Sequence, residues 1–166
     1  MRWLRGKGVS TAELKAAKEF GDTISKVVVY TEPTLHDSLG KKIVRLDEAK
    51  IMYRNYLASE FYDKSGGETF KFIQVGARRF RARMKNDDIT KLAEGRIVDI
   101  EELVTELNFD IMIPIFSIDY ISNGKEMIAI DFNIVQRLDK LGFRDVMSAD
   151  DVMAEIKRAL IAYNSI

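Results

Sequence analysis

Two apolar segments in the last third of the chain constrain the fold more than any other feature of the sequence. Residues 111–121 and 127–133 are rich in isoleucine and aromatic residues, and Asn123-Gly124 between them is a pair typical of turns. Polar side chains interrupt both segments at alternate positions. They are Ser117 and Asp119 in the first segment, and Asp131 and Asn133 in the second. We therefore expect an antiparallel hairpin with one apolar and one polar face.

The apolar pattern also predicts the register of this hairpin. With Asn123-Gly124 as a two-residue turn, Asp119 and Asp131 would lie on opposite faces. With a loop of three or five residues, Asp119 pairs with Ala129 and Ser117 with Asp131, so the polar side chains share one face. We favour the odd-length loop because it also keeps the apolar side chains together. Asp119 and Asp131 would then be diagonal neighbours, with Cβ atoms about 7–8 Å apart.

The polar face of this hairpin suggests a cation site. Carboxylates within apolar strands are costly to bury unless they are paired or bound to a cation. Oxygen atoms from Asp119, Asp131 and Asn133 would suit Mg²⁺, which typically takes one or two carboxylates together with substrate phosphates. The structural alternative is an amphipathic hairpin whose polar face is simply solvated.

The rest of the chain predicts a mixture of helices and hairpins. Strands are expected at residues 24–30 and 57–62, with a hairpin at 69–75 and 79–84 that turns at Gly76-Ala77. Helices are expected at residues 10–20, 47–53, 99–107 and 148–163, and residues 31–45 are expected to be a loop. We therefore expect one α+β domain over residues 1–166, with a mainly antiparallel sheet.

Composition excludes several classes of function. The 166 residues include no cysteine and one histidine, which excludes disulfides, thiolate metal sites, cysteine nucleophiles and multi-histidine metal sites. Lys+Arg and Asp+Glu both total 26, and this zero balance argues against broad binding to nucleic acid or an anionic membrane. The sequence has neither a long apolar span nor the apolar core of a secretory signal, so we expect a soluble cytoplasmic protein.

Several of these residues, taken in order, resemble the ATP-grasp superfamily. Asp119 followed by Asp131-Phe132-Asn133 resembles the family's metal-binding end, where an acid on one strand and an acid-x-Asn on the next hold magnesium against the ATP phosphates. Residues 57–62 resemble the segment that contacts adenine, and residues 70–83 resemble the next hairpin. Arg5-Gly6-Lys7-Gly8-Val9 resembles the end of the family's glycine-rich phosphate loop. The resemblance is best over residues 57–163.

The resemblance implies cofactors, an activity and a set of site residues. The cofactors are ATP and Mg²⁺. In full-length relatives, ATP phosphorylates a carboxylate, and an amine or thiol then displaces the phosphate. The residues implied are Asp119, Asp131 and Asn133 for Mg²⁺, Lys71 and Arg83 for the phosphates, and Glu60 for the nucleoside.

The chain also departs from the family's pattern. Family members are usually considerably longer, and their central subdomain carries a lysine that would here precede Met1. Residues 27–33 have no sure counterpart, and Ser117 stands where a basic residue is common. We therefore expect an ATP-binding unit that is incomplete or inactive alone: a fragment, a degenerate binder, or a subunit that a protein partner or a second copy completes.

Two other functions are left open by the sequence. An acid on one strand and acid-x-Lys on the next is typical of metal-dependent nucleases, but Asn133 replaces the lysine. A non-catalytic interaction protein is the second alternative. A basic stripe could meet phosphates, track single-stranded nucleic acid or be a solvated face. The stripe comprises Arg78, Arg79, Arg81, Arg83 and Lys85. We expect His36 to be a surface loop residue.

Overall fold

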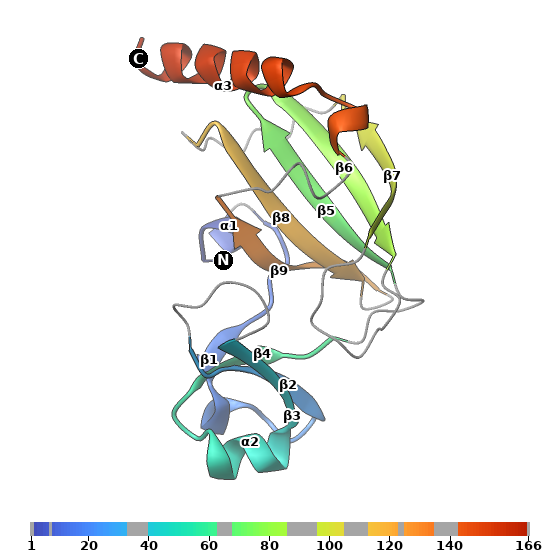
Figure 1. Ribbon diagram of the computed structural model, residues 1–166. Coiled ribbons are helices and arrows are strands. Elements are labelled where there is room, and N and C mark those ends of the chain that lie inside the picture. The colour runs from blue at the N-terminus through green and yellow to red at the C-terminus, as the bar shows by residue number, and fades with distance from the viewer. Residues whose placement is uncertain are drawn as a thin grey trace.

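The computed structural model describes residues 2–6, 8–32, 40–62, 68–85, 96–104, 113–122, 125–134 and 143–165. Within these ranges the strands form two antiparallel sheets, which make two lobes of the molecule (Figure 1). The α+β class with antiparallel sheets is therefore confirmed. No helix in these ranges is both long enough and apolar enough to cross a membrane. His36 lies outside the described residues.

The smaller sheet has the strand order β1-β4-β2-β3, and the larger sheet has the order β7-β6-β5-β8-β9. The strands of the smaller sheet are β1 (Leu14–Ala16), β2 (Lys26–Tyr30), β3 (Lys41–Arg45) and β4 (Leu57–Glu60). Those of the larger sheet are β5 (Glu68–Val75), β6 (Arg78–Lys85), β7 (Arg96–Glu102), β8 (Ile115–Ser122) and β9 (Met127–Asn133). The helices are α1 (Arg2–Gly6), α2 (Leu46–Met52) and α3 (Ala149–Tyr163), with short 3-10 helices η1 (Ala17–Glu19) and η5 (Phe143–Asp145).

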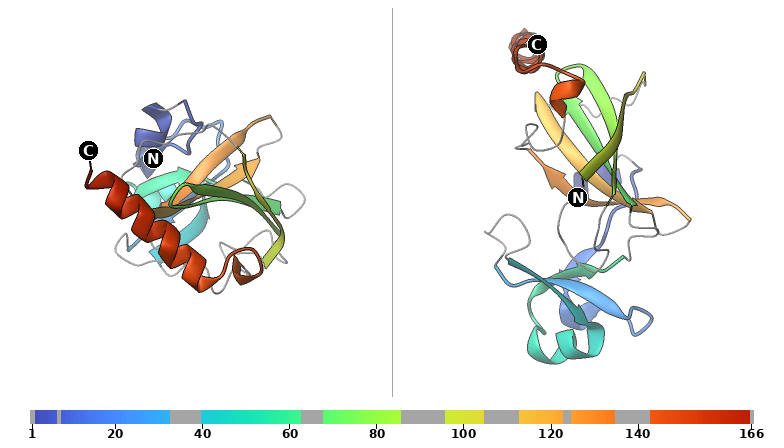
Figure 2. Two further views of the ribbon diagram at one scale, coloured as in Figure 1. Left: turned by 90° about the horizontal axis from the view of Figure 1, so that it is seen from above. Right: turned by 45° about the vertical axis from the view of Figure 1, so that its right-hand side comes forward.

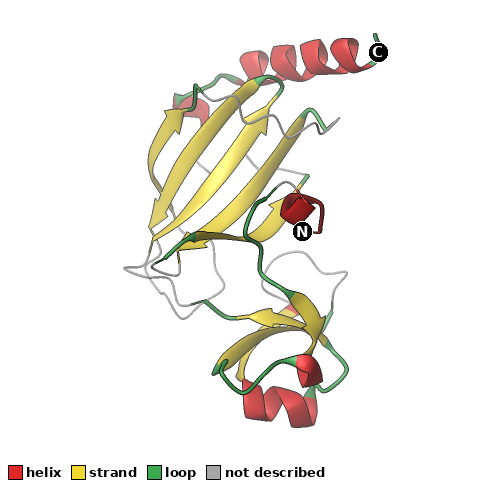
Figure 3. Ribbon diagram, turned by 180° about the vertical axis from the view of Figure 1, so that it is seen from behind, coloured by secondary structure: helices red, strands yellow, loops and turns green. Residues whose placement is uncertain are grey.

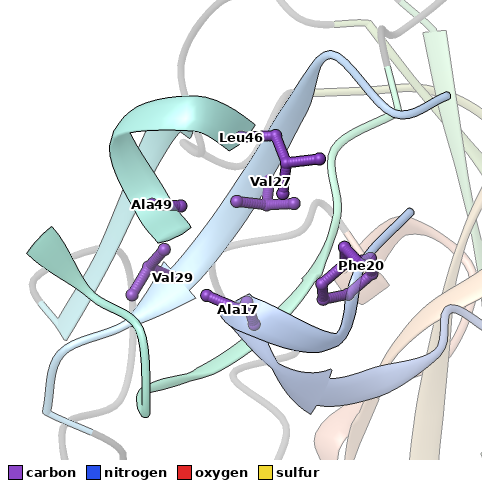
Figure 4. Close-up of a cluster of buried hydrophobic side chains, with 7 residues drawn as sticks. Ala17, Phe20, Val27, Val29, Leu46 and Ala49 are labelled. Carbon is purple, nitrogen blue, oxygen red and sulfur yellow. The ribbon is translucent and has the colours of Figure 1, made fainter. Parts of the chain in front are cut away.

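The core of the smaller sheet forms between β2 and α2. Val27 and Val29 alternate along the β-branched strand and are fully buried on one of its faces. Leu46 and Ala49, three residues apart on α2, pack against them, and Ala17 of η1 completes the contact (Figure 4). The predicted helix over 47–53 and the strand over 24–30 are therefore confirmed within a few residues, and the packing fixes β3 beside β2.

The larger sheet buries one face against η5 and α3. Phe80 of β6 contacts Phe143 of η5 edge to face, with ring centroids 4.9 Å apart. The backbone N–H of Asp151 donates to the Ser148 side chain at 3.1 Å, so Ser148 caps α3, and the helix expected over residues 148–163 is confirmed. α3 lies across the end of this sheet that is distant from the smaller lobe (Figure 2). The buried residues of this face are Ile73, Val75, Phe80, Ala82, Phe143 and Met147.

The opposite face of the larger sheet is covered by α1. Leu4 of α1 is buried against Phe72, Phe116, Ile118 and Ala129. Phe72 of β5 lies opposite Ile118 of β8, Phe116 is the next residue of β8 on that face, and Ala129 belongs to β9. The two faces of this sheet therefore have different coverings: α1 on one side, and η5 with α3 on the other.

The glycines near the N-terminus end a helix instead of preceding one. α1 stops at Gly6, and Gly8 has φ +77°, the left-handed conformation that commonly follows a helix. The N–H groups of Gly8 and Val9 donate to the carbonyl groups of Arg5 and Leu4 at 3.0 and 3.1 Å. No helix directly follows these glycines, so residues 8–16 offer no helix N-terminus to a phosphate. The resemblance of residues 5–9 to a phosphate loop stays a prediction, and Lys7 lies outside the described residues.

Residues 10–12 join the two sheets. The N–H of Ala12 donates to the carbonyl oxygen of Ala129 at 2.9 Å, and the N–H of Ala129 donates to that of Ser10 at 2.8 Å. The chain then enters β1 in the smaller lobe (Figure 3). The helix predicted over 10–20 is therefore wrong. Ser10 and Glu13 have the spacing of a helix-capping pair, which favours a helix locally. The backbone of this segment instead forms hydrogen bonds with β9 and β4, and these tertiary contacts override the local preference.

Residues 96–102 form a strand where the sequence predicted the start of a helix. β7 pairs with β6 and places its acidic residues opposite the basic stripe. Arg81 lies 2.6 Å from Glu101, and Arg78 donates to Glu102 at 2.7 and 2.6 Å. The Arg78 guanidinium holds the pKa of the Glu102 carboxyl below its usual range. Cross-strand ion pairs of this kind stabilise a sheet and account for Arg78 and Arg81 without a ligand.

The turn between β5 and β6 depends on Gly76. This residue has φ +57°, and a Cβ atom added there would meet the Glu155 carbonyl oxygen of α3 at 2.7 Å. Gly76→Ala is therefore expected to lower the free energy of unfolding by about 2 kcal/mol, from backbone strain and loss of α3 packing. Urea denaturation measures this loss. Ala77→Gly is the matched control and should cost under about 1 kcal/mol. Equal stability of the two variants would contradict this account of the turn.

Candidate functional site

The predicted polar hairpin is present, but its register differs from the expected one. Asp119 lies directly opposite Asp131 and Ser117 opposite Asn133, whereas we expected Asp119 opposite Ala129. Beyond Asp119 the register shifts, so that Tyr120 pairs with Ala129. Opposed residues have Cβ atoms about 4.5–5.5 Å apart, closer than the diagonal spacing that the sequence predicted.

A bulge explains the difference in register. Residues 123–126 connect the strands, because Ser122 pairs with Met127, and this loop has an even length. Ile130 is the extra residue on β9, and a bulge of one residue reverses the alternation beyond it. The bulge therefore places the polar residues of both strands on one face, which we expected a loop of odd length to do. The expected loop length is wrong, and the expected sharing of one face by the polar residues is confirmed.

Lys71 of β5 completes this polar face. It is the cross-strand neighbour of Asp119, and the two side chains form an ion pair with Nζ–Oδ1 3.0 Å. Lys71 is only 3% exposed, and Asp119 is 22% exposed. The Asn133 amide lies 3.5 Å from the other Asp119 oxygen. Lysine is almost never buried to this degree unless it is paired, so Asp119 accounts for the position of Lys71.

Asp131 is the most exposed carboxylate of this group. Its Oδ1 accepts the N–H of Phe132 at 2.9 Å. Its Oδ2 lies 3.8 Å from Nζ of Lys41, which belongs to β3 of the smaller sheet. The side chain is 45% exposed and has room to accept a further partner. The group therefore lies where the two sheets approach each other.

Ser117 adds a buried hydroxyl to the same face. Its side chain is fully buried, and among the described residues its Oγ has no hydrogen-bond partner. A buried hydroxyl without a partner costs about 1–3 kcal/mol, which a bound polar group would recover. Ser117 is one cross-strand step from Asn133 and two residues from Asp119. We name Lys71, Ser117, Asp119, Asp131 and Asn133 the polar cluster.

The polar cluster fits magnesium better than zinc. The described residues contain no group of three or more histidine, cysteine or acidic side chains suited to a metal. Asp119, Asp131 and Asn133 offer two carboxylates and one amide oxygen. Zinc sites in proteins are usually built largely from histidine and cysteine, whereas Mg²⁺ accepts one or two carboxylates and completes its shell with water and phosphate. The residues present therefore fit Mg²⁺ that is shared with a phosphate ligand.

Apolar clusters flank the polar cluster on the same face of the larger sheet. On one side lie the residues covered by η5 and α3. On the other side Ala12, Ile121 and Ile128 are buried, and Tyr62 and Ile130 pack against them. Electrostatic interactions in such apolar surroundings are stronger than in water, which strengthens the attraction between Lys71 and Asp119.

Glu60 is the final residue of β4 in the smaller sheet. The Tyr62 hydroxyl donates to its Oε2 at 3.0 Å, and it is Tyr62 that packs against the larger sheet. Burial and then the Glu60 carboxylate raise the pKa of Tyr62 to about 12. Glu60 therefore lies where the chain crosses between the lobes, next to the apolar cluster that borders the polar cluster.

Tyr62→Phe is expected to remove a pH-dependent contribution to stability. The folded-state pKa is raised above its ordinary value of 10.0, so protonated Tyr62 stabilises the fold fully below pH 10. This contribution is lost as the pH rises toward 12. Urea denaturation at a series of pH values should show a constant difference from the parent chain up to about pH 9, then a decline. Tyr56→Phe, at an exposed tyrosine, is the control. A difference that persists unchanged to pH 12 would contradict the assignment.

The structure does not bring Arg83 to the polar cluster. Arg83 lies opposite Phe70, whereas Lys71 lies opposite Ala82, so the two basic side chains are on different faces of the sheet. Arg83 instead pairs in register with Asp99 of β7. The resemblance assigned Lys71 and Arg83 to one phosphate site without regard to the face of the sheet that each occupies. A role for Arg83 in binding a ligand stays a prediction.

Lys41 is the site residue that sequence reasoning missed. We expected a loop over residues 31–45, but residues 41–45 form β3 and pair with β2 throughout. The β-branched pair Ile43-Val44, flanked by basic residues, is the signal that could have predicted this strand. The approach of Lys41 to Asp131 depends on how the two lobes pack, and this cannot be predicted from a local sequence pattern.

Comparison with solved structures finds enzymes of similar fold. D-alanine–D-alanine ligase from Bacillus anthracis matches with a TM-score of 0.52 and 14% identity, covering 99% of this chain and 66% of the ligase. The same enzyme complexed with ATP gives 0.54 and 13%, covering 99% and 65%. Macrocyclase MdnC from Microcystis aeruginosa MRC, bound with precursor peptide MdnA, gives 0.55 and 15%, covering 93% and 56%. No protein-family model and no curated protein sequence matches.

These matches extend over nearly the whole chain. The smaller sheet, with β2 at its centre, thus belongs to the shared fold, although the sequence resemblance left residues 27–33 without a counterpart. The chain spans 56–66% of the length of these three solved chains. At 13–15% identity the likeness concerns the fold alone. Its two antiparallel sheets with their helices have the fold of the ATP-grasp enzymes.

Proposed function

We propose that this chain binds ATP together with Mg²⁺ at the polar cluster. The observation that carries the proposal is the buried Lys71–Asp119 ion pair beside Asp131 and Asn133, on a sheet face that meets the second lobe. A solved structure of the same fold is a complex with ATP. The unpartnered Ser117 hydroxyl supports a polar ligand at this place.

Each residue of the polar cluster has a proposed task. Asp119, Asp131 and Asn133 would hold Mg²⁺, which when bound neutralises the charge of phosphate oxygens. Lys71 keeps Asp119 oriented and supplies positive charge within the sheet. Ser117 would donate its hydroxyl to the bound group. Glu60, oriented by the Tyr62 hydroxyl, would contact the nucleoside where the chain crosses between the lobes.

Ligase chemistry is the wider proposal. Proteins with the same fold include a D-alanine–D-alanine ligase and a macrocyclase bound with a precursor peptide. We propose that the chain serves ATP-dependent carboxylate–amine ligation and is incomplete or inactive alone. Because it spans only part of those proteins' length, a protein partner or a second copy would supply the remaining contacts to the substrate.

The nuclease alternative gains no support from the fold. A nuclease that tracks DNA with the basic stripe needs its arginines beside the metal ligands. Arg81 and Arg83 face away from Asp119 and lie opposite Glu101 and Asp99 of β7. The carboxylates of Glu101 and Asp99 therefore lie beside these arginines and would repel the DNA phosphates that this alternative requires them to bind.

Thermal unfolding tests the proposed binding. We expect ATP with Mg²⁺ to raise the melting temperature, whereas ATP alone and Mg²⁺ alone raise it little, because phosphate and carboxylates repel each other without the cation. At a hundredfold excess over Kd the stabilisation is about 2.7 kcal/mol, or roughly 5–10 °C for a chain of this size. Absence of any shift at millimolar Mg²⁺ and ATP would contradict the proposal.

A further inference from the structure

Lys41 of the smaller sheet reaches the polar cluster of the larger one. Its Nζ lies 3.8 Å from Oδ2 of Asp131 and 5.6 Å from the ring centroid of Tyr30. Asp131 and Lys41 are separated by ninety positions in the sequence, so only the packing of the lobes brings them together. The Lys41 side chain is 27% exposed, so it is partly open to solvent.

The backbone before Lys41 is held tightly, while its side chain is not. The N–H of Thr31 donates to the Gly40 carbonyl at 2.8 Å, and a Cβ atom at Gly40 would meet the Glu32 carbonyl oxygen at 2.3 Å. This close pairing fixes the start of β3. A charge-assisted hydrogen bond to a carboxylate is about 2.7–2.9 Å long, so the separation of 3.8 Å from Asp131 is a loose contact. The long lysine stem can therefore exchange one anion for another without movement of the strand.

A divalent cation at Asp131 would compete with Lys41. Both cations require the same carboxylate, and Mg²⁺ carries the higher charge density. Phosphate oxygens on that Mg²⁺ would then be the anions nearest to the Lys41 ammonium group. We propose that Lys41 neutralises Asp131 in the free protein and transfers to a phosphate oxygen when Mg²⁺ and nucleotide bind, which ties the smaller sheet to the ligand. This inference rests on the proposed nucleotide site and adds a phosphate-binding residue to it.

The proposal predicts effects of opposite sign for metal alone and for nucleotide with metal. In Lys41→Met the competing ammonium group is absent, so Mn²⁺ alone should bind several-fold more tightly, as measured by electron paramagnetic resonance. The same variant should bind ATP with Mg²⁺ about tenfold to a hundredfold more weakly by calorimetry, because a charge-assisted contact is lost. Lys41→Arg should keep much of the nucleotide affinity.

Lys42→Met is the matched control. Lys42 is the next residue of β3, and its Nζ contacts the Tyr53 hydroxyl at 3.5 Å within the smaller lobe. Both affinities should match those of the parent chain, and the melting temperatures of both variants without ligand should be unchanged. If Lys41→Met weakens nucleotide binding without tightening Mn²⁺ binding, or changes neither affinity, the exchange is refuted while nucleotide binding stands. If the parent chain itself fails to bind ATP with Mg²⁺, the proposed function fails, and this inference fails with it.

Discussion

Lys71→Met is expected to lower the free energy of unfolding by about 3 kcal/mol. Lys71 is 3% exposed and pairs with Asp119 at 3.0 Å, so its removal leaves a largely buried carboxylate without its cation. Breaking such a pair costs about 3–5 kcal/mol in fully buried sites, and we take the lower value because Asp119 is 22% exposed. Urea denaturation measures the loss. Lys15→Met, at the more exposed pair with Glu13, should cost under about 1 kcal/mol.

The double variant Lys71→Met/Asp119→Leu tests the reason for that loss. Replacing both charges by apolar groups removes the uncompensated carboxylate, and such replacements are often neutral. We therefore expect the double variant to be more stable than either single variant. Additive losses in the double-mutant cycle would show that the two side chains act independently, and the ion pair would then not explain the burial of Lys71.

Asp131→Asn is expected to weaken the binding of ATP with Mg²⁺ by about tenfold to a hundredfold, because a contact to a charged group is lost. Asp131 is 45% exposed and its pairing with Lys41 is loose, so its removal should change the stability of the free chain little. Asp131→Asn should therefore lower nucleotide affinity with little change in the free energy of unfolding, whereas Lys71→Met should lower the free energy of unfolding. Isothermal calorimetry measures the affinity.

Glu101→Gln is the control for Asp131→Asn. Glu101 is an acidic residue of the same sheet, but it pairs with Arg81 on the opposite face. The substitution Glu101→Gln removes the same charge from the protein as Asp131→Asn but leaves the polar cluster unchanged, so the affinity for nucleotide should be unchanged. An equal loss in both variants would mean that net charge, not metal binding, governs the affinity.

Local sequence patterns predicted the elements whose signals act over a few residues. The turn at Gly76-Ala77, the helix over residues 47–53 and the start of the last helix at Ser148 depend on neighbours in the chain, and all are present. The sharing of one face by Ser117, Asp119, Asp131 and Asn133 was also predicted correctly. The apolar face was not, because the bulge places Ile128 opposite Ile121 on the polar-cluster face and Ala129 on the other face.

The errors arise where pairing with distant segments overrides a local signal. Ser10 and Glu13 have the spacing of a helix cap, but β9 and β4 take up the backbone of this segment. Asp99 begins the helix expected over residues 99–107, but it lies in β7 opposite Arg83. The bulge at Ile130 could not be predicted from the loop length and the alternation of side chains. One extra residue in a strand reverses which side chains share a face, and no local pattern marks it. The pairing of Lys41 with Asp131 needs both lobes in place.

The most direct test of the central claim is a crystal structure with Mg²⁺ and a non-hydrolysable ATP analogue. We predict the metal between Asp119, Asp131 and Asn133, with the phosphates on the face of the larger sheet that meets β3. An analogue on the opposite face beside Arg81 and Arg83, or a metal bound away from Asp119 and Asp131, would contradict the account.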